Sequence, residues 1–98
     1  MAFVQIIDMH TSEFEKINQL EDEWRSATEG KRTPTHAITG KDRDSANTYI
    51  QVVEFPSYED AMRNSELPET TALAGKMQAL CDGPAIFRNL DVLREETP

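Results

Sequence analysis

The sequence predicts an α+β domain with the element order β-α-β-β-α-β. Three observations indicate this class. Residues 2–10 are apolar on both alternating faces, as in the middle strand of a sheet; apolar residues between 14 and 27 recur at helical spacing; and residues 48–55 alternate again as a strand. The 98 residues are enough for one domain, so we expect residues 1–98 to fold as a single unit.

The first predicted strand covers residues 2–10. Phe3 and Met9 share one face of it, and Val4 and Ile6 share the other, because side chains alternate along a strand. Two apolar faces indicate a strand that is covered on both sides, hence a central one.

A helix is expected to follow the first strand. Ser12 and Glu15 have the spacing of a capping box, which places the start of the helix at Ser12. Gly30 is the expected C-cap, and the acidic residues, Glu21 among them, are assigned to the solvated surface. The buried stripe is predicted at spacings of three and four residues, at Phe14, Ile17, Leu20, Trp24 and Ala27.

The rest of the chain predicts a hairpin, a helical crossover in two pieces and a last strand. Residues 35–39 and 48–55 would form the hairpin. Ser57 is expected to cap a short helix that runs to about Ser65, and Pro68 to be the N1 residue of a second helical piece over about 69–80. A turn at 82–84 leads to a last strand over 85–94.

This order is that of the ferredoxin-like split βαβ fold. Right-handed crossovers give an antiparallel four-stranded sheet with the first and third strands in the centre and the helices on one face. The other face also carries large apolar residues, so we expect a second copy of the chain to cover it in a homodimer.

Charge and composition exclude several classes of protein. The chain has 18 acidic and 10 basic residues and a net charge of −8, which argues against binding to nucleic acid or to an anionic membrane surface. It contains no apolar run near the roughly 18 residues of a membrane span and no secretory signal, so a cytoplasmic protein is expected. Cys81 is the single cysteine and fits a reducing compartment; we expect it to pack as a small hydrophobic residue.

Two histidines are the candidate catalytic bases near neutral pH. His10 ends the first strand, and His36 lies in the second strand beside Ile38. Each also has a structural interpretation. His10 could form hydrogen bonds near the start of the first helix, and His36 could be a surface or dimer-contact residue.

Five further residues are candidates for binding a substrate, and each also has a structural interpretation. Trp24 would stack on a planar ligand, and the Tyr49 phenol needs a partner if it is buried. Gln51 lies among apolar neighbours, so its amide must face a ligand or pair across a dimer. The remaining two are the methionines Met62 and Met77, which suit an adaptable pocket lining.

Four segments carry a resemblance to the dimeric α+β barrel superfamily over almost the whole chain. They are FVQII at 3–7, EFPSYEDA at 54–61, LCDGP at 80–84 and FRNLDV at 87–92. The closing turn and strand are also similar to those of small actinobacterial members without an assigned role. The resemblance implies two subunits whose sheets face each other as a barrel, with a pocket between the sheet and the helices of each subunit.

The same resemblance sets the functional hypotheses. Its members include cofactor-free antibiotic-biosynthesis monooxygenases, haem-degrading monooxygenases, polyketide cyclases and isomerases. The first strand lacks the Asn of the haem-degrading members, and residues 57–81 lack their Trp and His. Neither a metal site nor a phosphate-binding loop is present in the sequence, so no cofactor is expected.

We therefore expect a small-molecule-binding protein, with a cofactor-independent monooxygenase that acts on a planar carbonyl or phenolic compound as the first hypothesis. Such an enzyme needs a base that makes an enolate or phenolate and an apolar pocket where that anion meets dioxygen. The alternatives are an enzyme like a polyketide cyclase or isomerase, which consumes no oxygen, and a non-catalytic dimeric binding protein.

Overall fold

Four strands and three helices make up the computed structural model, which describes residues 2–98. Their order confirms the predicted α+β class, with the second helical region divided in two as expected. No helix within residues 2–98 is long and apolar enough to cross a membrane. The elements are β1 (Phe3–His10), α1 (Phe14–Ala27), β2 (His36–Lys41), β3 (Thr48–Phe55), α2 (Tyr58–Glu66), α3 (Pro68–Ala79) and β4 (Ile86–Asp91).

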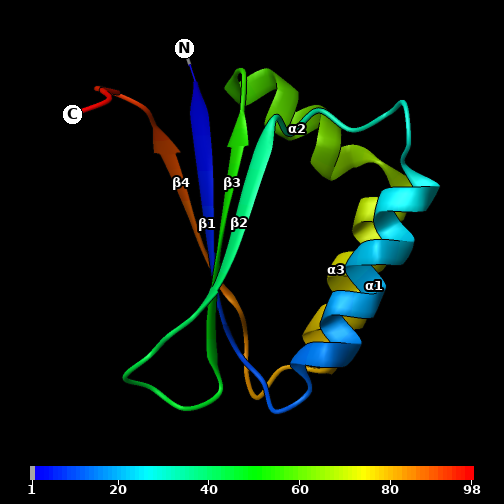
Figure 1. Ribbon diagram of the computed structural model, residues 1–98. Coiled ribbons are helices and arrows are strands. Elements are labelled where there is room, and N and C mark those ends of the chain that lie inside the picture. The colour runs from blue at the N-terminus through cyan, green and yellow to red at the C-terminus, as the bar shows by residue number, and fades with distance from the viewer. Residues whose placement is uncertain (1) are drawn as a thin grey trace.

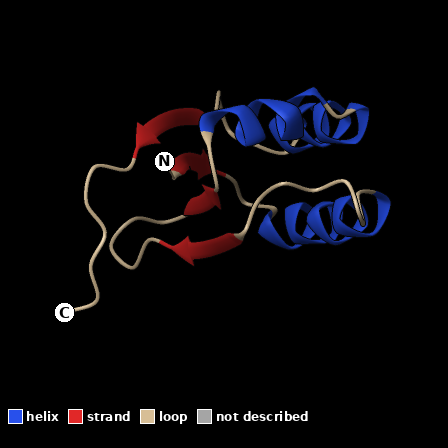
Figure 2. Cartoon of the chain, turned by 90° about the horizontal axis from the view of Figure 1, so that it is seen from above, coloured by secondary structure: helices blue, strands red, loops and turns tan. Residues whose placement is uncertain are grey.

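The four strands form one antiparallel sheet in the order β2-β3-β1-β4. The predicted central positions of the first and third strands are therefore confirmed. Figure 1 and the view from above in Figure 2 show two layers, the sheet on one side and the helices on the other. We call the face toward the helices the inner face and the opposite one the outer face.

The strand register assigns residues to the two faces. Phe3 pairs with Phe55, and the Phe3 ring packs edge-on against Tyr58 of α2 with ring centroids 5.4 Å apart. This contact fixes the inner face, which alternation then extends along β1 and β3. The core cluster on it comprises Phe3, Phe55 and Ala61, with Val53 and Met62 packed against them.

The predicted capping box at Ser12 is wrong, because α1 begins at Phe14 and Glu13 precedes it without a side-chain cap. The buried hydroxyl of Thr11 accepts a hydrogen bond from the Glu13 backbone N–H at 3.0 Å instead. The same hydroxyl donates to the Leu80 carbonyl at 2.7 Å, so it joins the start of α1 to the end of α3. A tertiary contact thus replaces the local cap.

The other helix ends differ in how well they were predicted. Thr28 rather than Gly30 terminates α1, and its backbone N–H bonds to the Trp24 carbonyl. Ser57 caps α2 as predicted, since its Oγ accepts from the Asp60 N–H at 3.1 Å. Pro68 is the first residue of α3, also as predicted.

The edge strands have bounds slightly different from those expected. Strand β2 extends to Lys41, two residues further than predicted, while β4 ends at Asp91 instead of 94. Asp91 pairs with Phe3, the first residue of β1, and beyond this pair the Val92 N–H donates a hydrogen bond to the Ala2 carbonyl at 3.1 Å.

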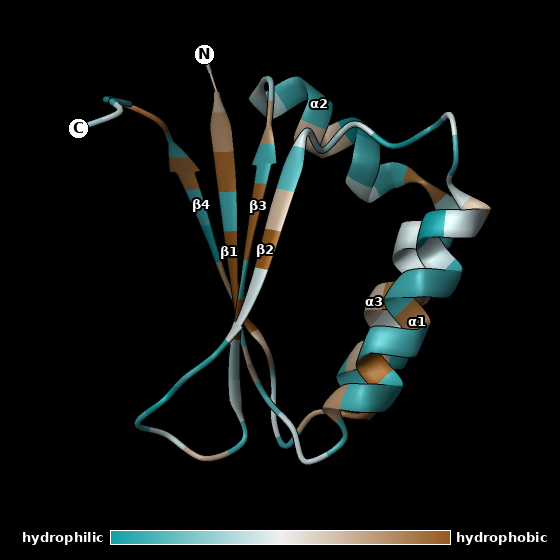
Figure 3. Ribbon diagram, viewed as in Figure 1, coloured by the Kyte–Doolittle hydropathy of each residue, from teal (hydrophilic) through white to brown (hydrophobic). Residues whose placement is uncertain are grey.

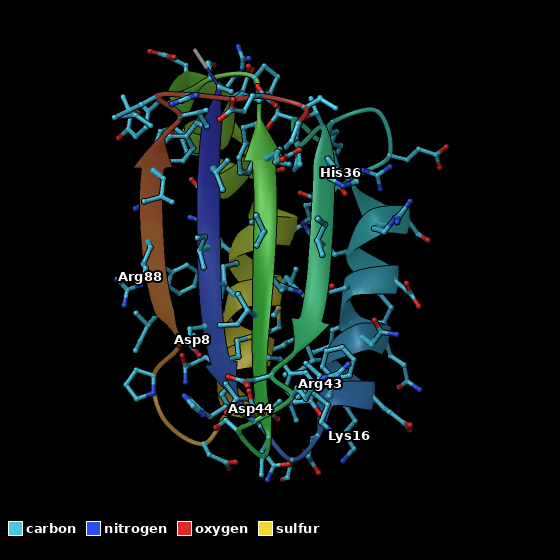
Figure 4. The ribbon with its side chains drawn as sticks, turned by 60° about the vertical axis from the view of Figure 1, so that its left-hand side comes forward. Asp8, Lys16, His36, Arg43, Asp44 and Arg88 are labelled. Carbon is cyan, nitrogen blue, oxygen red and sulfur yellow. The ribbon has the colours of Figure 1, made fainter. Side chains whose placement is uncertain are left out.

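The outer face carries exposed apolar side chains from both edge strands. Ile38 of β2 is 56% exposed, and Ile86 and Leu90 of β4 are 50% and 44% exposed. Figure 3 shows hydrophobic segments on all four strands, and Figure 4 shows the outer face turned to the viewer with the helices behind it. The outer face of the sheet therefore presents apolar side chains that the chain itself does not cover.

Candidate functional site

A polar pair joins the sheet to α1 across the inner face. Gln51 of β3 is only 7% exposed, and its amide nitrogen donates a hydrogen bond to Oε1 of Glu21 on α1. The same nitrogen lies 3.4 Å from the hydroxyl of Thr39 on β2. Gln51 was expected to face a ligand or to pair across a dimer, and it has its partners within its own chain.

Glu21 is not on the solvated surface, so that expectation was wrong. Its side chain is half-buried, and burial is the main cause that raises the pKa of its carboxyl above the usual range. The hydrogen bond from Gln51 lowers the pKa by a smaller amount, and the neighbouring charge of Asp22 raises it.

The spacing along α1 contained a signal for this placement. Glu21 lies four residues after Ile17, which is fully buried, and three before Trp24. These three residues fall on one stripe, whereas Ala27, predicted on the stripe, is exposed. A carboxylate on the stripe that holds the buried Ile17 is expected to face the protein interior.

An aromatic stack lies next to the polar pair. The rings of Phe14 and Tyr49 are stacked, with centroids 4.3 Å apart and an interplanar angle of 11°. Tyr49 is two residues from Gln51 on the same face of β3. A hollow of about 460 Å³ opens beside the stack, between the start of α1 and β3, and is lined by Ser12, Glu13, Phe14, Glu15, Lys16 and Tyr49.

Trp24 lies one helical turn beyond Glu21, at the seam between α1 and α3. Its indole nitrogen donates to the hydroxyl of Thr70 at 2.9 Å, and the guanidinium of Arg32 lies 6.0 Å from the ring centre. A smaller hollow of about 250 Å³ at this seam is lined by Leu20, Glu23, Trp24, Ala27, Glu69, Ala72, Leu73 and Lys76.

The two methionines lie elsewhere in the helical layer. Met62 of α2 packs against the core cluster around Phe3. Met77 of α3 is half-buried. Neither lines one of the two hollows described above.

Both histidines lie on the outer face, away from the Gln51–Glu21 pair. Nδ1 of His10 is 3.1 Å from the hydroxyl of Thr48, and its Nε2 is 3.6 Å from a carboxylate oxygen of Asp8. His36 stands opposite Glu54 at the exposed edge strand β2 (Figure 4). The thickness of the sheet thus separates the predicted bases from the predicted substrate-binding residues Tyr49 and Gln51.

The other kinds of candidate site are metal-binding groups and reactive thiols. Within residues 2–98, no three histidine, cysteine or acidic side chains gather as a metal-binding group. Cys81 is half-buried, and burial together with Asp82 raises the pKa of its thiol, which favours the neutral, unreactive form.

No family model and no curated protein matches the sequence. Solved structures do match its fold. A putative antibiotic biosynthesis monooxygenase from Caulobacter crescentus superposes with a TM-score of 0.81 at 7% identity, over 95% of this chain and 91% of that one. The Rv0793 protein of Mycobacterium tuberculosis gives 0.80 at 12% identity, over 99% and 100%.

A third similar structure is SnoaB, a cofactor-independent oxygenase from Streptomyces nogalater. It gives a TM-score of 0.74 at 14% identity and covers 99% of this chain and 95% of its own. The TM-scores establish the shared fold, whereas identities this low leave the chemistry open. The chain has the ferredoxin-like α+β fold of the antibiotic-biosynthesis-monooxygenase-like proteins.

Proposed function

We propose that this protein is a homodimeric, cofactor-independent monooxygenase that acts on a planar carbonyl or phenolic compound bound between the sheet and α1. The observation that carries the proposal is the Gln51–Glu21 hydrogen bond, which places an amide and a carboxylate between the sheet and α1 beside the Tyr49 ring. The fold shared with SnoaB, a cofactor-independent oxygenase, supports the reaction class.

The inner face suits a flat ligand with oxygen atoms at one end. A ring that rests on Tyr49 would be held by stacking. The Gln51 amide N–H that faces Thr39 at 3.4 Å in the free protein would instead donate to the oxygen atom of the ligand. Trp24, Met62 and Met77 lie in the same helical layer, outside the hollow beside Tyr49. An aromatic wall with a few convergent polar groups is typical of small-molecule sites.

The reaction needs no metal or cofactor in its overall balance. A CH₂ group next to a conjugated carbonyl loses a proton to a base, and the resulting carbanion is oxidised by dioxygen. One oxygen atom becomes a new carbonyl oxygen, and the other leaves as water together with both hydrogen atoms. A site that excludes bulk water favours this course, because it limits protonation of the anion.

The predicted bases, His36 and His10, would meet a substrate only on the outer face. We propose that this face instead contacts the second subunit. A folded chain of 11.1 kDa exposes roughly 5,650 Å² by the usual scaling, whereas this one exposes 6820 Å². The excess of about 1,200 Å² exceeds the roughly 800 Å² that each partner buries in a standard interface. We also propose a cytoplasmic location, which suits the single free thiol of Cys81.

Oxygen uptake with anthrone, a planar enolisable ketone, tests the proposed reaction. The expected result is one O₂ consumed for each new carbonyl formed. Gln51→Leu should lower kcat by roughly 10²-fold, as the loss of one donor at a developing oxyanion does, while Gln19→Leu at an exposed position of α1 should not change it. The double variant His10→Gln, His36→Gln should turn over normally, and a large loss there would restore the histidines as bases.

Two outcomes would overturn the monooxygenase proposal. A product formed without oxygen uptake would indicate a cyclase or isomerase. Saturable binding of such ketones with no product would indicate a binding protein.

A further inference from the structure

We propose that Glu21 is the catalytic base that removes the proton from the substrate. The assignment rests on the proposed function and deepens it, because it names the group that generates the reactive anion. It places the base on the inner face, beside Gln51 and Tyr49, and not on the outer face where the histidines lie.

In the part of the chain that the structure describes, Glu21 lacks the cation that pairs with several other half-buried carboxylates. Glu13 pairs with Lys16, and Glu69 pairs with Lys31 at 2.7 Å. Within residues 2–98, no lysine, arginine or histidine forms an ion pair with Glu21. A carboxylate without a cation keeps its basicity, because no opposite charge stabilises its ionised form.

The hydrogen bond from Gln51 orients the Glu21 carboxylate but uses only one of its two oxygen atoms. The amide donates to Oε1, and no hydrogen bond from residues 2–98 reaches Oε2. The neighbouring hydroxyl of Thr39, 3.4 Å from the same nitrogen, helps to hold the amide in place. One oxygen is therefore fixed by the sheet while the other has a lone pair available for an incoming proton.

Burial supports the same assignment. Desolvation is the main cause that raises the pKa of Glu21, because burial makes its ionised form less stable than in water. When the substrate O–H or C–H bond breaks, the proton goes to Oε2 and the electron pair stays on the substrate as a phenolate or enolate. Glu21 becomes neutral as the negative charge passes to the conjugated ligand. A base whose pKa is closer to neutral pH works more efficiently in such a transfer.

The hollow at the start of α1 gives a route to this group. Tyr49 lines the hollow, and Gln51 lies two residues further along β3, a distance of about 6.6 Å at the usual strand rise. A planar ligand that displaces Phe14 from the Tyr49 ring would direct its oxygen or its acidic C–H toward Gln51 and Glu21. Entry of the ligand therefore requires the stacked pair to open.

Hydrogen–deuterium exchange in the absence of oxygen isolates the proton-removal step. The probe is 2-tetralone, whose CH₂ group between the ring and the carbonyl exchanges with D₂O once a base removes a proton. Proton NMR follows the loss of that signal with the whole protein under argon. The wild type should accelerate exchange, and its rate should rise with pH as Glu21 loses its proton.

Three variants make the test specific. Glu21→Gln keeps the shape of the side chain and should lower the exchange rate by roughly 10²-fold or more, the usual contribution of a general base. Glu21→Asp restores a carboxylate and should recover part of the rate. Glu29→Gln removes a charge from an exposed position just after the same helix and should leave the rate unchanged. Thermal unfolding of each variant confirms that it is folded.

The outcomes separate this inference from the proposed function. Exchange by Glu21→Gln at the wild-type rate, or oxygen uptake by the wild type without any exchange, would overturn the role of Glu21 and leave the monooxygenase proposal standing. Exchange that depends on Glu21 in a protein that consumes no oxygen would support the base and refute the oxygenase. A wild type that catalyses neither reaction would refute both.

Discussion

The outer face of the sheet provides a quantitative prediction for the homodimer. Ile38 is 56% exposed in the isolated chain and lies on edge strand β2. Complete burial of such a side chain stabilises by about 2 kcal/mol, so covering the exposed fraction contributes about 1.1 kcal/mol per subunit. A two-fold symmetric interface contains the residue twice, which makes the total about 2.2 kcal/mol.

Ile38→Ala should therefore raise the dimer dissociation constant by up to about 40-fold, since each 1.4 kcal/mol is a factor of ten. Sedimentation equilibrium over a range of protein concentrations measures this constant directly. Leu93→Ala is the matched control, because Leu93 is 89% exposed but follows the last strand and lies outside the sheet. It should leave the dissociation constant unchanged.

Equal dissociation constants for the two variants would refute the reasoning, because the more exposed leucine would then matter as much as the sheet residue. A wild type that is monomeric at all accessible concentrations would refute the homodimer itself. Circular dichroism of both variants distinguishes a weakened interface from a damaged fold.

Three further predictions concern single residues. Gly75→Ala should stabilise α3 by up to about 1 kcal/mol and raise Tm by about 4–8 °C in calorimetry, because an added Cβ meets no heavy atom within 4 Å; a lower Tm would contradict it. Burial raises the pKa of Glu21 above 4.5, so the folded state holds its proton more tightly than the unfolded state does. The free energy of unfolding of the wild type therefore falls as the pH rises from about 4.5 to the raised pKa. Glu21→Gln should therefore have a higher urea midpoint than the wild type at pH 7, and the two midpoints should converge below pH 4.5. A difference in midpoint that stays constant with pH would contradict the raised pKa. Cys81 should react with iodoacetamide more slowly than free cysteine at pH 7, and Asp82→Asn should speed the reaction, because burial and that charge raise the thiol pKa.

Local patterns in the sequence predicted most of the elements. The strand over 48–55 has the predicted bounds, and Ser57 and Pro68 mark the helix starts where they were expected. These signals succeed because each depends on neighbours a few residues away: alternation of side chains, a hydroxyl near a free N–H, and the fixed φ of proline. The cap at Ser12 failed because the Thr11 hydroxyl bonds to Leu80, 69 residues distant.

The composition of the candidate site depended on tertiary structure. Alternation predicts that His36 and Ile38 share a face, but only the packing of the helices determines that this face points away from Gln51. The side of α1 that meets the sheet was similarly ambiguous, since Leu20 and Glu21 are adjacent on the helix.

The sequence by itself therefore determined the order of the elements, the central strands and an apolar sheet face left uncovered. Spacing along α1 places Glu21 beside the buried stripe, but tertiary structure decided that its partner is Gln51, 30 residues away, and that the histidines lie on the opposite face. The physical reason is that a side chain's partner across two packed layers is set by their relative rotation, and neither hydropathy nor spacing within one element records that rotation.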